Sequence, residues 1–268
     1  MKKYIIIAVA SILAFSGCSN INDNQNTPQE MTFTAGFSDG VQTRASLYDN
    51  MKKVKFDAED KISILDGVNN NEFTTMGGGA SALFSGTATP ATTYYAIYPY
   101  QAGLSFDGTF IKKLSIPTIQ SFTFTGDCGW DPSAPIAYAI TTGTSFTFSN
   151  LCALLKVTND QEYVVTITIQ DSDNAAIMTG DFDCDISTGT LTENGDDGSS
   201  SASGVLVVGV PAKKTVYLAI APCTVGHLVA KWTYGVSSGG SKTKSSHTTF
   251  EAGKIYDLGK TTAWTEPY

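Results

Sequence analysis

Short runs of alternating apolar and polar residues, separated by turn-forming clusters, constrain the fold of this chain more than any other feature. Alternation of this kind puts successive side chains on opposite faces of a β-strand. No stretch shows the apolar spacing of an amphipathic helix, so the sequence predicts an all-β fold. We expect strands at residues 31–37, 61–65, 93–98, 110–116, 145–148, 153–158, 163–170, 204–210, 215–221, 229–234 and 254–258.

The amino-acid composition supports this prediction. Charged residues make up only 16% of the 268-residue chain, whereas about 25% is usual in globular proteins. Thr, Ser, Asn and Gly fill the difference, and Thr favours strands while Gly favours turns. An all-β chain of this length most naturally forms two sandwiches, and we place the boundary between them between residues 142 and 143.

The formal net charge of −8 argues against two classes of partner. A nucleic-acid-binding protein needs clustered basic residues to neutralise phosphates, and we therefore expect no nucleic-acid partner. The same negative charge disfavours attraction of the folded body to anionic lipid.

The amino terminus has the pattern of an exported lipoprotein. Two lysines precede an apolar run at residues 4–15, and small residues then lead into Cys18, a sequence that resembles a bacterial lipobox. The run is too short to span a bilayer and is typical of a signal peptide. We predict a signal peptide at residues 1–17, acylation of Cys18 and anchoring in the outer membrane by acyl chains. An ordinary signal peptide with an incidental cysteine is the alternative.

Residues 18–30 are polar and contain a proline, and they read as a flexible tether.

Residues suited to catalysis or metal binding are scarce. His227 and His247 lie at no metal-ligand spacing, and the chain has no Gly-x-Ser-x-Gly elbow, phosphate-binding loop or dinucleotide fingerprint. We therefore expect no enzymatic activity, no cofactor and no metal centre. Three acidic loops, at residues 66–72, 171–174 and 194–197, could hold calcium through oxygen ligands. The same residues are typical of solvated turns, and the question stays open.

Four cysteines follow Cys18, and their state is open at this point. Cys128, Cys152, Cys184 and Cys223 permit two disulfides in three connectivities, or free thiols packed as small apolar side chains.

Two tryptophans are candidates for ligand binding. Trp130 and Trp232 could stack on sugar rings if their faces are exposed, and the alternative is that both pack in a core.

Several segments, in order along the chain, resemble the fimbrillin family of Bacteroidetes, the subunits of protease-assembled pili. The most similar is Tyr94-Tyr95-Ala96-Ile97-Tyr98-Pro99-Tyr100. In the segment at 56–64, Phe56 and Glu59 stand where the family usually has Trp and Gly. The other matching segments are residues 43–45, 116–120, 148–157, 217–222 and 250–258, so that the resemblance spans about residues 31–260.

The resemblance implies two tandem transthyretin-like β-sandwich domains, at residues 31–142 and 143–268. It also implies export as an outer-membrane lipoprotein and cleavage after an arginine by an Arg-specific protease. The cut would remove a first strand within residues 31–44, and a strand from another pilin subunit would fill the groove. The strand-exchange segment implied in this way presents Met31, Phe33, Ala35 and Phe37 at alternate positions.

Arg44 is the only arginine in the chain, although Lys and Arg together number 17. It follows the expected first strand in a polar stretch, so an Arg-specific protease would have one target, the Arg44–Ala45 bond. The alternative is an ordinary surface arginine.

The sequence thus predicts a non-enzymatic subunit of a cell-surface fimbria, exported as a lipoprotein and assembled by protease-triggered strand exchange to support adhesion. It does not distinguish a stalk, tip or anchor subunit, and it does not identify a ligand on a host or bacterial surface. The alternative function is a surface glycan-binding outer-membrane lipoprotein.

Overall fold

A computed structural model describes residues 27–38, 46–48, 53–196, 201–235, 238–244 and 247–264. The predicted lipidation residue Cys18 and the predicted processing residues Arg44 and Ala45 lie outside these ranges. Within them the chain is built from strands, and the all-β prediction is confirmed. The described part contains no helix long and apolar enough to cross a membrane.

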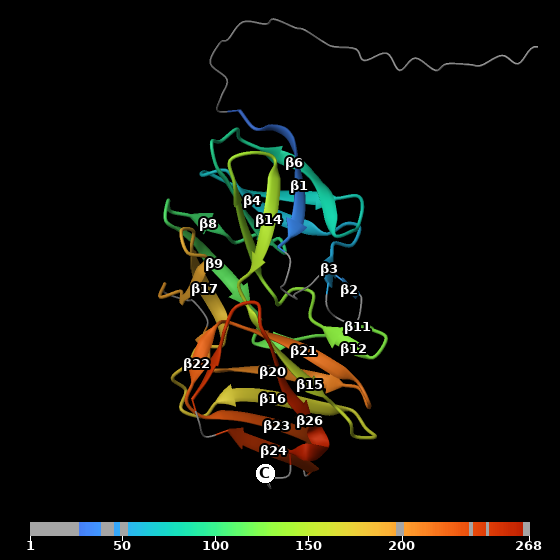
Figure 1. The fold of residues 1–268 in the computed structure, drawn as a ribbon. Coiled ribbons are helices and arrows are strands. Elements are labelled where there is room, and N and C mark those ends of the chain that lie inside the picture. The colour runs from blue at the N-terminus through green and yellow to red at the C-terminus, as the bar shows by residue number, and fades with distance from the viewer. Residues whose placement is uncertain are drawn as a thin grey trace, which may run out of the picture.

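The first part of the fold is a closed seven-stranded barrel, in the upper half of Figure 1. Going around the barrel, the strands are β1 (Gln29–Phe37), β14 (Ser145–Asn150), β13 (Ala137–Thr141), β7 (Tyr94–Tyr98), β4 (Lys61–Leu65), β5 (Asn70–Thr75) and β6 (Ser81–Ala88). β6 pairs with β1 and closes the ring.

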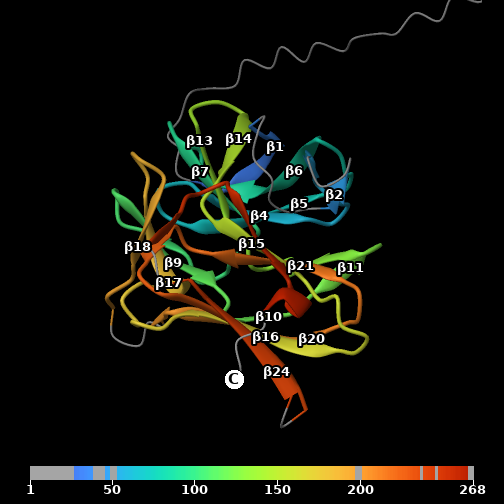
Figure 2. The ribbon, with the colours of Figure 1, turned by 60° about the horizontal axis from the view of Figure 1, so that its bottom comes forward.

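Below the barrel lie two five-stranded sheets that pack face to face (Figures 1 and 2). The outer sheet consists of β10 (Ile119–Gln120), β20 (Gly204–Val210), β16 (Val165–Asp171), β23 (Leu228–Tyr234) and β24 (Ser238–Lys244). The middle sheet consists of β11 (Thr123–Thr125), β12 (Cys128–Trp130), β21 (Thr215–Ile220), β15 (Ala153–Thr158) and β26 (Ile255–Lys260).

A third, bridging sheet and two short ribbons complete the strands. The bridging sheet consists of β18 (Thr190–Glu193), β17 (Thr179–Asp185), β9 (Phe110–Ile116) and β8 (Ser105–Phe106), with β19 (Ser201–Ala202) paired to β17. The ribbons are β2 (Ser46–Tyr48) with β3 (Lys53–Lys55), and β22 (Cys223–Val225) with β25 (Thr248–Phe250).

The middle sheet is buried on both faces and separates two cores. Leu154 belongs to the core that contains the barrel interior, whereas its neighbour Leu155 belongs to the core between the middle and outer sheets. The same alternation holds along β21, where Tyr217 faces the first core and Leu218 the second. Strands covered on both faces have long apolar runs, which explains the apolar residues at successive positions of β15 and β21. Polar residues such as Lys156 and Thr158 lie towards the end of β15.

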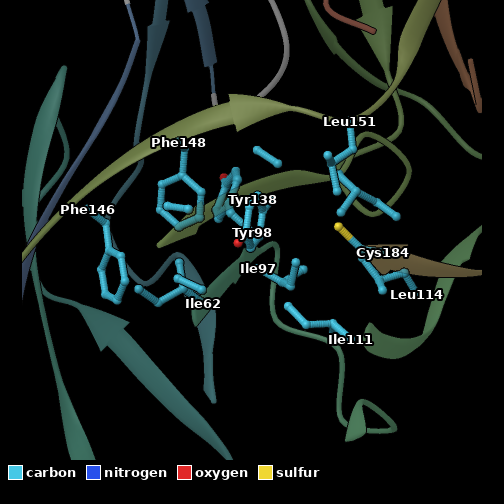
Figure 3. Packing of buried hydrophobic residues seen from close by; sticks show 14 of the residues in the cluster. Ile62, Ile97, Tyr98, Ile111, Leu114, Tyr138, Phe146, Phe148, Leu151 and Cys184 are labelled. Carbon is cyan, nitrogen blue, oxygen red and sulfur yellow. The ribbon is translucent and has the colours of Figure 1, made fainter. Parts of the chain in front are cut away.

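The barrel interior is continuous with the apolar face of the bridging sheet. Figure 3 shows Phe146 and Phe148 of β14 at one end of this core and Ile111, Leu114 and Cys184 of the bridging sheet at the other. The two halves of the molecule are therefore joined by a shared core and not only by a linker.

The strand pairing does not follow the boundary expected between residues 142 and 143. β13 and β14 lie on either side of that position and pair with each other inside the barrel. β9, from the first part of the chain, pairs with β17 from the second. The hydrogen bonds thus require that both parts of the sequence contribute to the same sheets.

Most predicted strands are found within one or two residues of their expected ends, and β4, β9, β15 and β20 have the expected bounds. The expectation of two tandem transthyretin-like sandwiches stays a prediction. In the described residues the first half closes into a barrel, and only the second half has two facing sheets.

The four described cysteines form no disulfide with one another; Cys152 and Cys184 are buried, and Cys128 and Cys223 are half-buried. Burial raises the pKa of the Cys184 thiol to about 12 and that of Cys223 to about 11. Few of these thiols are therefore ionised at neutral pH, and the thiolate is the reactive form.

We expect the mass of the purified protein to be unchanged by reduction. In the native state, Cys152 and Cys184 should react with a thiol reagent about 100-fold more slowly than in denaturant, because reaction needs both access and a thiolate. Mass spectrometry measures both the mass before and after reduction and the rate at which the thiols are alkylated. A mass increase on reduction, corresponding to a broken disulfide, would contradict this account.

Candidate functional site

β1 closes the barrel by pairing with a different strand on each side. It is antiparallel to β6 from Gln29 to Gly36, and parallel to β14 from Thr34 to Phe37. The N–H of Thr34 donates to the carbonyl of Thr144 at 2.9 Å. Figure 1 shows β1 between β6 and β14 at the top of the molecule. Without β1, both neighbouring strands would become open edges.

Phe33 places its ring at the centre of the barrel core. The side chain is fully buried, and its ring centroid lies 5.6 Å from that of Phe73, 5.0 Å from Tyr94 and 5.1 Å from Phe146. These partners belong to three other barrel strands. Edge-to-face and tilted contacts at this spacing are favourable beyond the area that they bury.

Phe37 joins a second group of rings near the end of β1. Its centroid lies 4.9 Å from that of Phe56, 5.8 Å from Tyr98 and 5.7 Å from Phe148. The backbone N–H and the side-chain hydroxyl of Ser38 both donate to the carbonyl of Phe148, which fixes the end of the strand.

The other inward positions of β1 complete the pattern. Ala35 is fully buried opposite Ala82. Met31 is half-buried, and its sulfur accepts a hydrogen bond from the Tyr94 hydroxyl at 3.6 Å. The four residues predicted as the strand-exchange segment therefore do lie on one face, directed into the barrel core.

The outward positions of β1 are polar and exposed. Thr32 and Thr34 alternate with the inward residues, and the Thr32 hydroxyl lies 3.2 Å from that of Ser85 on β6. A slip of one residue would turn the phenylalanines to solvent and the threonines to the core. The side-chain pattern therefore specifies the register of any strand that occupies this position.

The two tryptophans predicted as ligand aromatics are buried in different cores. Trp130 is 7% exposed and packs with the barrel core, while Trp232 is 8% exposed and packs between the middle and outer sheets. Neither ring offers the open face that stacking on a sugar requires. The described structure therefore holds no observation that favours the glycan-binding alternative at these positions.

The acidic loops use their carboxylates to fix the backbone. Asp66 accepts N–H groups of Val68, Asn69 and Thr89 and the amide of Asn71. Burial tends to raise the pKa of Asp66, but these hydrogen bonds outweigh it, and the pKa lies below its usual value. Among the described residues, no three His, Cys, Asp or Glu side chains converge as a metal site would require.

The surface contact between His227 and Asp173 differs from a catalytic arrangement. The Nδ1 atom of His227 lies 2.6 Å from a carboxylate oxygen of Asp173. The hydroxyl of the nearby Ser172 donates to the backbone carbonyl of His227 and not to its ring. This geometry supplies no activated serine nucleophile.

A solved structure shares this arrangement of strands. It is a candidate cell adhesion protein from Bacteroides uniformis, with a TM-score of 0.53 and 16% sequence identity over 88% of this chain and 94% of its own. This chain has the fold of that adhesion candidate. At 16% identity, this likeness concerns the fold alone.

Two further structures superpose less fully. One is a candidate cell adhesion protein from Bacteroides thetaiotaomicron, with a TM-score of 0.43, 12% identity, and coverage of 85% of this chain and 92% of its own. The other is the tip fimbrial protein Mfa3 from Porphyromonas gingivalis, with a TM-score of 0.35, 8% identity, and coverage of 86% and 94%. No family model and no curated protein matches the chain.

Two barrel strands, β5 and β6, were not predicted from the sequence, and β6 is the one that pairs with β1 along most of its length. The inward positions of β6 include the small residues Ala82, Gly86 and Ala88, which give a weak apolar signal. In β5 the buried positions are Phe73 and Thr75, so only one large apolar residue marks that strand. The alternation around Phe84 was the available signal, since this residue is fully buried opposite Phe33.

We expect Phe33→Ala to reduce the free energy of unfolding by about 3–5 kcal/mol, since it leaves a cavity where three rings now meet. Thr34→Ala on the exposed face of the same strand is the matched control and should cost about 1 kcal/mol or less. Urea denaturation of both variants measures the difference. Equal effects of the two substitutions would show that β1 is not an integral part of the barrel core.

Proposed function

We propose that this protein is a structural subunit of a cell-surface fimbria that assembles by strand exchange and supports adhesion. The observation that carries the proposal is the position of β1, a terminal strand whose buried Phe33 and Ala35 complete the barrel. The printed sequence places the only arginine shortly after this strand. A single cut at the Arg44–Ala45 bond would sever β1 from the rest of the barrel.

Loss of β1 would create an acceptor site with defined chemistry. The backbone edges of β6 and β14 would lose their partner, and the rings that contact Phe33 and Phe37 would face an open groove. An incoming strand with apolar residues at alternate positions would recover both the main-chain hydrogen bonds and the aromatic contacts. β1 makes these same hydrogen bonds and aromatic contacts in the uncut chain.

The resident strand also protects the subunit before assembly. An open groove with two unpaired edges and a row of exposed rings is an aggregation hazard. Because β1 fills the groove until the chain is cut, the uncut protein can be exported in a closed form. Strand exchange would then be limited to the cell surface, where the protease acts.

Export and anchoring complete the proposal. The signal peptide at residues 1–17 and acylation of Cys18 would hold the uncut chain at the outer membrane, and the tether would separate the barrel from the lipid. Cutting after Arg44, followed by replacement of β1, would release the folded body from this anchor. The partners would be other pilin subunits, in a homopolymer or a mixed fibre, and an Arg-specific protease.

A disulfide staple between β1 and β6 tests the exchange step. Thr32→Cys with Ser85→Cys joins two residues that face each other on the outside of the barrel, with hydroxyls 3.2 Å apart. After cutting with an Arg-specific protease, the oxidised variant should stay monomeric. The same cut sample should form oligomers once the staple is reduced, as measured by size-exclusion chromatography with light scattering.

A second staple is the matched control. Thr158→Cys with Thr215→Cys joins β15 and β21 in the second half, where the hydroxyls are 2.9 Å apart. This variant should form oligomers after cutting whether it is oxidised or reduced. If the cut wild-type chain stays monomeric, or if the β1–β6 staple has no effect, the strand-exchange proposal is wrong.

A further inference from the structure

A cavity of about 260 Å³ lies at the open edge of the second half, away from the barrel. Its walls come from the last strands of both facing sheets, β24 of the outer sheet and β26 of the middle sheet, together with β23 and β25. Figure 1 shows β24 as the last strand of the stack that runs from β20 through β16 and β23.

The floor of this cavity is apolar. Leu228 and Ala230 of β23 and Phe250 of β25 form part of it, and all three belong to the core between the two sheets. Tyr256 and Leu258 of β26 line the opposite side and are only half-buried, although they pack against the same core. The cavity is therefore an uncovered part of an otherwise closed hydrophobic interior.

β24 leaves the core uncovered because of the residues that it carries. In the antiparallel register with β23, Lys242 stands opposite Ala230 and Gly240 stands opposite Trp232. These are positions on the core-facing side, where an apolar side chain is usual. Lys242 instead extends towards β26, and its ammonium lies 3.4 Å from the carbonyl oxygen of Leu258.

Trp264 lies beside the cavity, between Gly240 of β24 and Leu258 of β26. This residue follows the short 3-10 helix Thr261–Ala263, is 2% exposed, and donates from its indole to the carbonyl of Leu258 at 3.2 Å. A Cβ atom at Gly240 would lie 2.3 Å from the Trp264 carbonyl oxygen, so only glycine fits there. The cavity stays open on the Lys242 side.

The charges at the mouth of the cavity are not balanced. Asp257 lies at the rim, but its carboxylate is paired with Lys156 at 2.7 Å and also accepts the N–H of Gly259. The ammonium of Lys242 lies 3.4 Å from the carbonyl oxygen of Leu258, and its charge also helps to lower the pKa of Asp257. Two lysines therefore act on one carboxylate, and one positive charge is in excess. A positive charge at the edge of an apolar cavity is complementary to an anion that carries an apolar body.

We propose that this cavity binds a small amphipathic carboxylate, with its hydrocarbon part on Leu228, Phe250 and Leu258 and its carboxylate on Lys242. The volume suits a molecule of about ten non-hydrogen atoms, because one such atom with its hydrogens occupies on the order of 20–25 Å³ in a close-packed site. The ammonium gains a charged acceptor in place of a neutral carbonyl, and charge-assisted hydrogen bonds are the stronger kind. This site does not depend on strand exchange at the barrel.

The test compares two probes that differ in charge but have the same chain. Octanoate and 1-octanol are titrated into the uncut protein, with binding followed by calorimetry and by protein-observed NMR. We expect octanoate to bind with one-to-one stoichiometry and about tenfold more tightly than octanol, which corresponds to one charge-assisted contact. Lys242→Met should remove this preference and leave the two affinities equal.

Two further variants separate the cavity from general effects. Lys231→Met removes a lysine from the adjacent strand at a position that faces Ser241 across the ladder, and should leave the tenfold preference intact. Leu258→Trp should fill the cavity and abolish binding of both probes, with the thermal unfolding midpoint checked for each variant.

The proposal is overturned if neither probe binds, if both bind equally to the native protein, or if Lys242→Met keeps the preference. In those cases Lys242 would serve only as an inward-pointing charge that keeps the edge strand β24 from pairing with another chain.

Discussion

The contact between Phe33 and the rings of the barrel is the interaction on which the first half of this structure depends. It joins one strand near the amino terminus to Phe73, Tyr94 and Phe146, which come from β5, β7 and β14. Because these strands surround the core, the ring of Phe33 fills a space that none of them can close alone. The hydrogen bonds of β1 to β6 and β14 then complete the ladder around the barrel.

The second half gives this barrel a rigid support. The middle sheet packs one face on the core of the barrel and bridging sheet and the other on the outer sheet. Most buried residues of both cores therefore belong to strands other than β1, and the proposed loss of β1 would leave them in place. The groups that would lose partners are the backbone edges of β6 and β14 and the side chains around the inward face of β1. Strand exchange of the proposed kind requires that the rest of the subunit stays folded when β1 is replaced.

The sequence predicted the strands with strong alternation and missed those without it. The strand β16 is predicted clearly because Val165, Ile167 and Ile169 all point inward. The strand β24 is not predicted, because its core-facing positions hold glycine and lysine in place of apolar residues. Neither the barrel closure nor the pairing of β9 with β17 is visible from the residues, since the strands that pair lie far apart in the sequence. The inward face of β1 was predictable, because alternation fixes which side chains share a face.

Replacement of β1 by an identical peptide tests directly whether this strand can be exchanged. The chain is cut after Arg44 and mixed with an isotopically labelled peptide of residues 27–44, and native mass spectrometry follows the peptide bound to the body. We expect the labelled peptide to replace the resident strand in proportion to its concentration, and a peptide with Phe33→Asp not to replace it. A resident strand that never exchanges, or equal incorporation of both peptides, would contradict it.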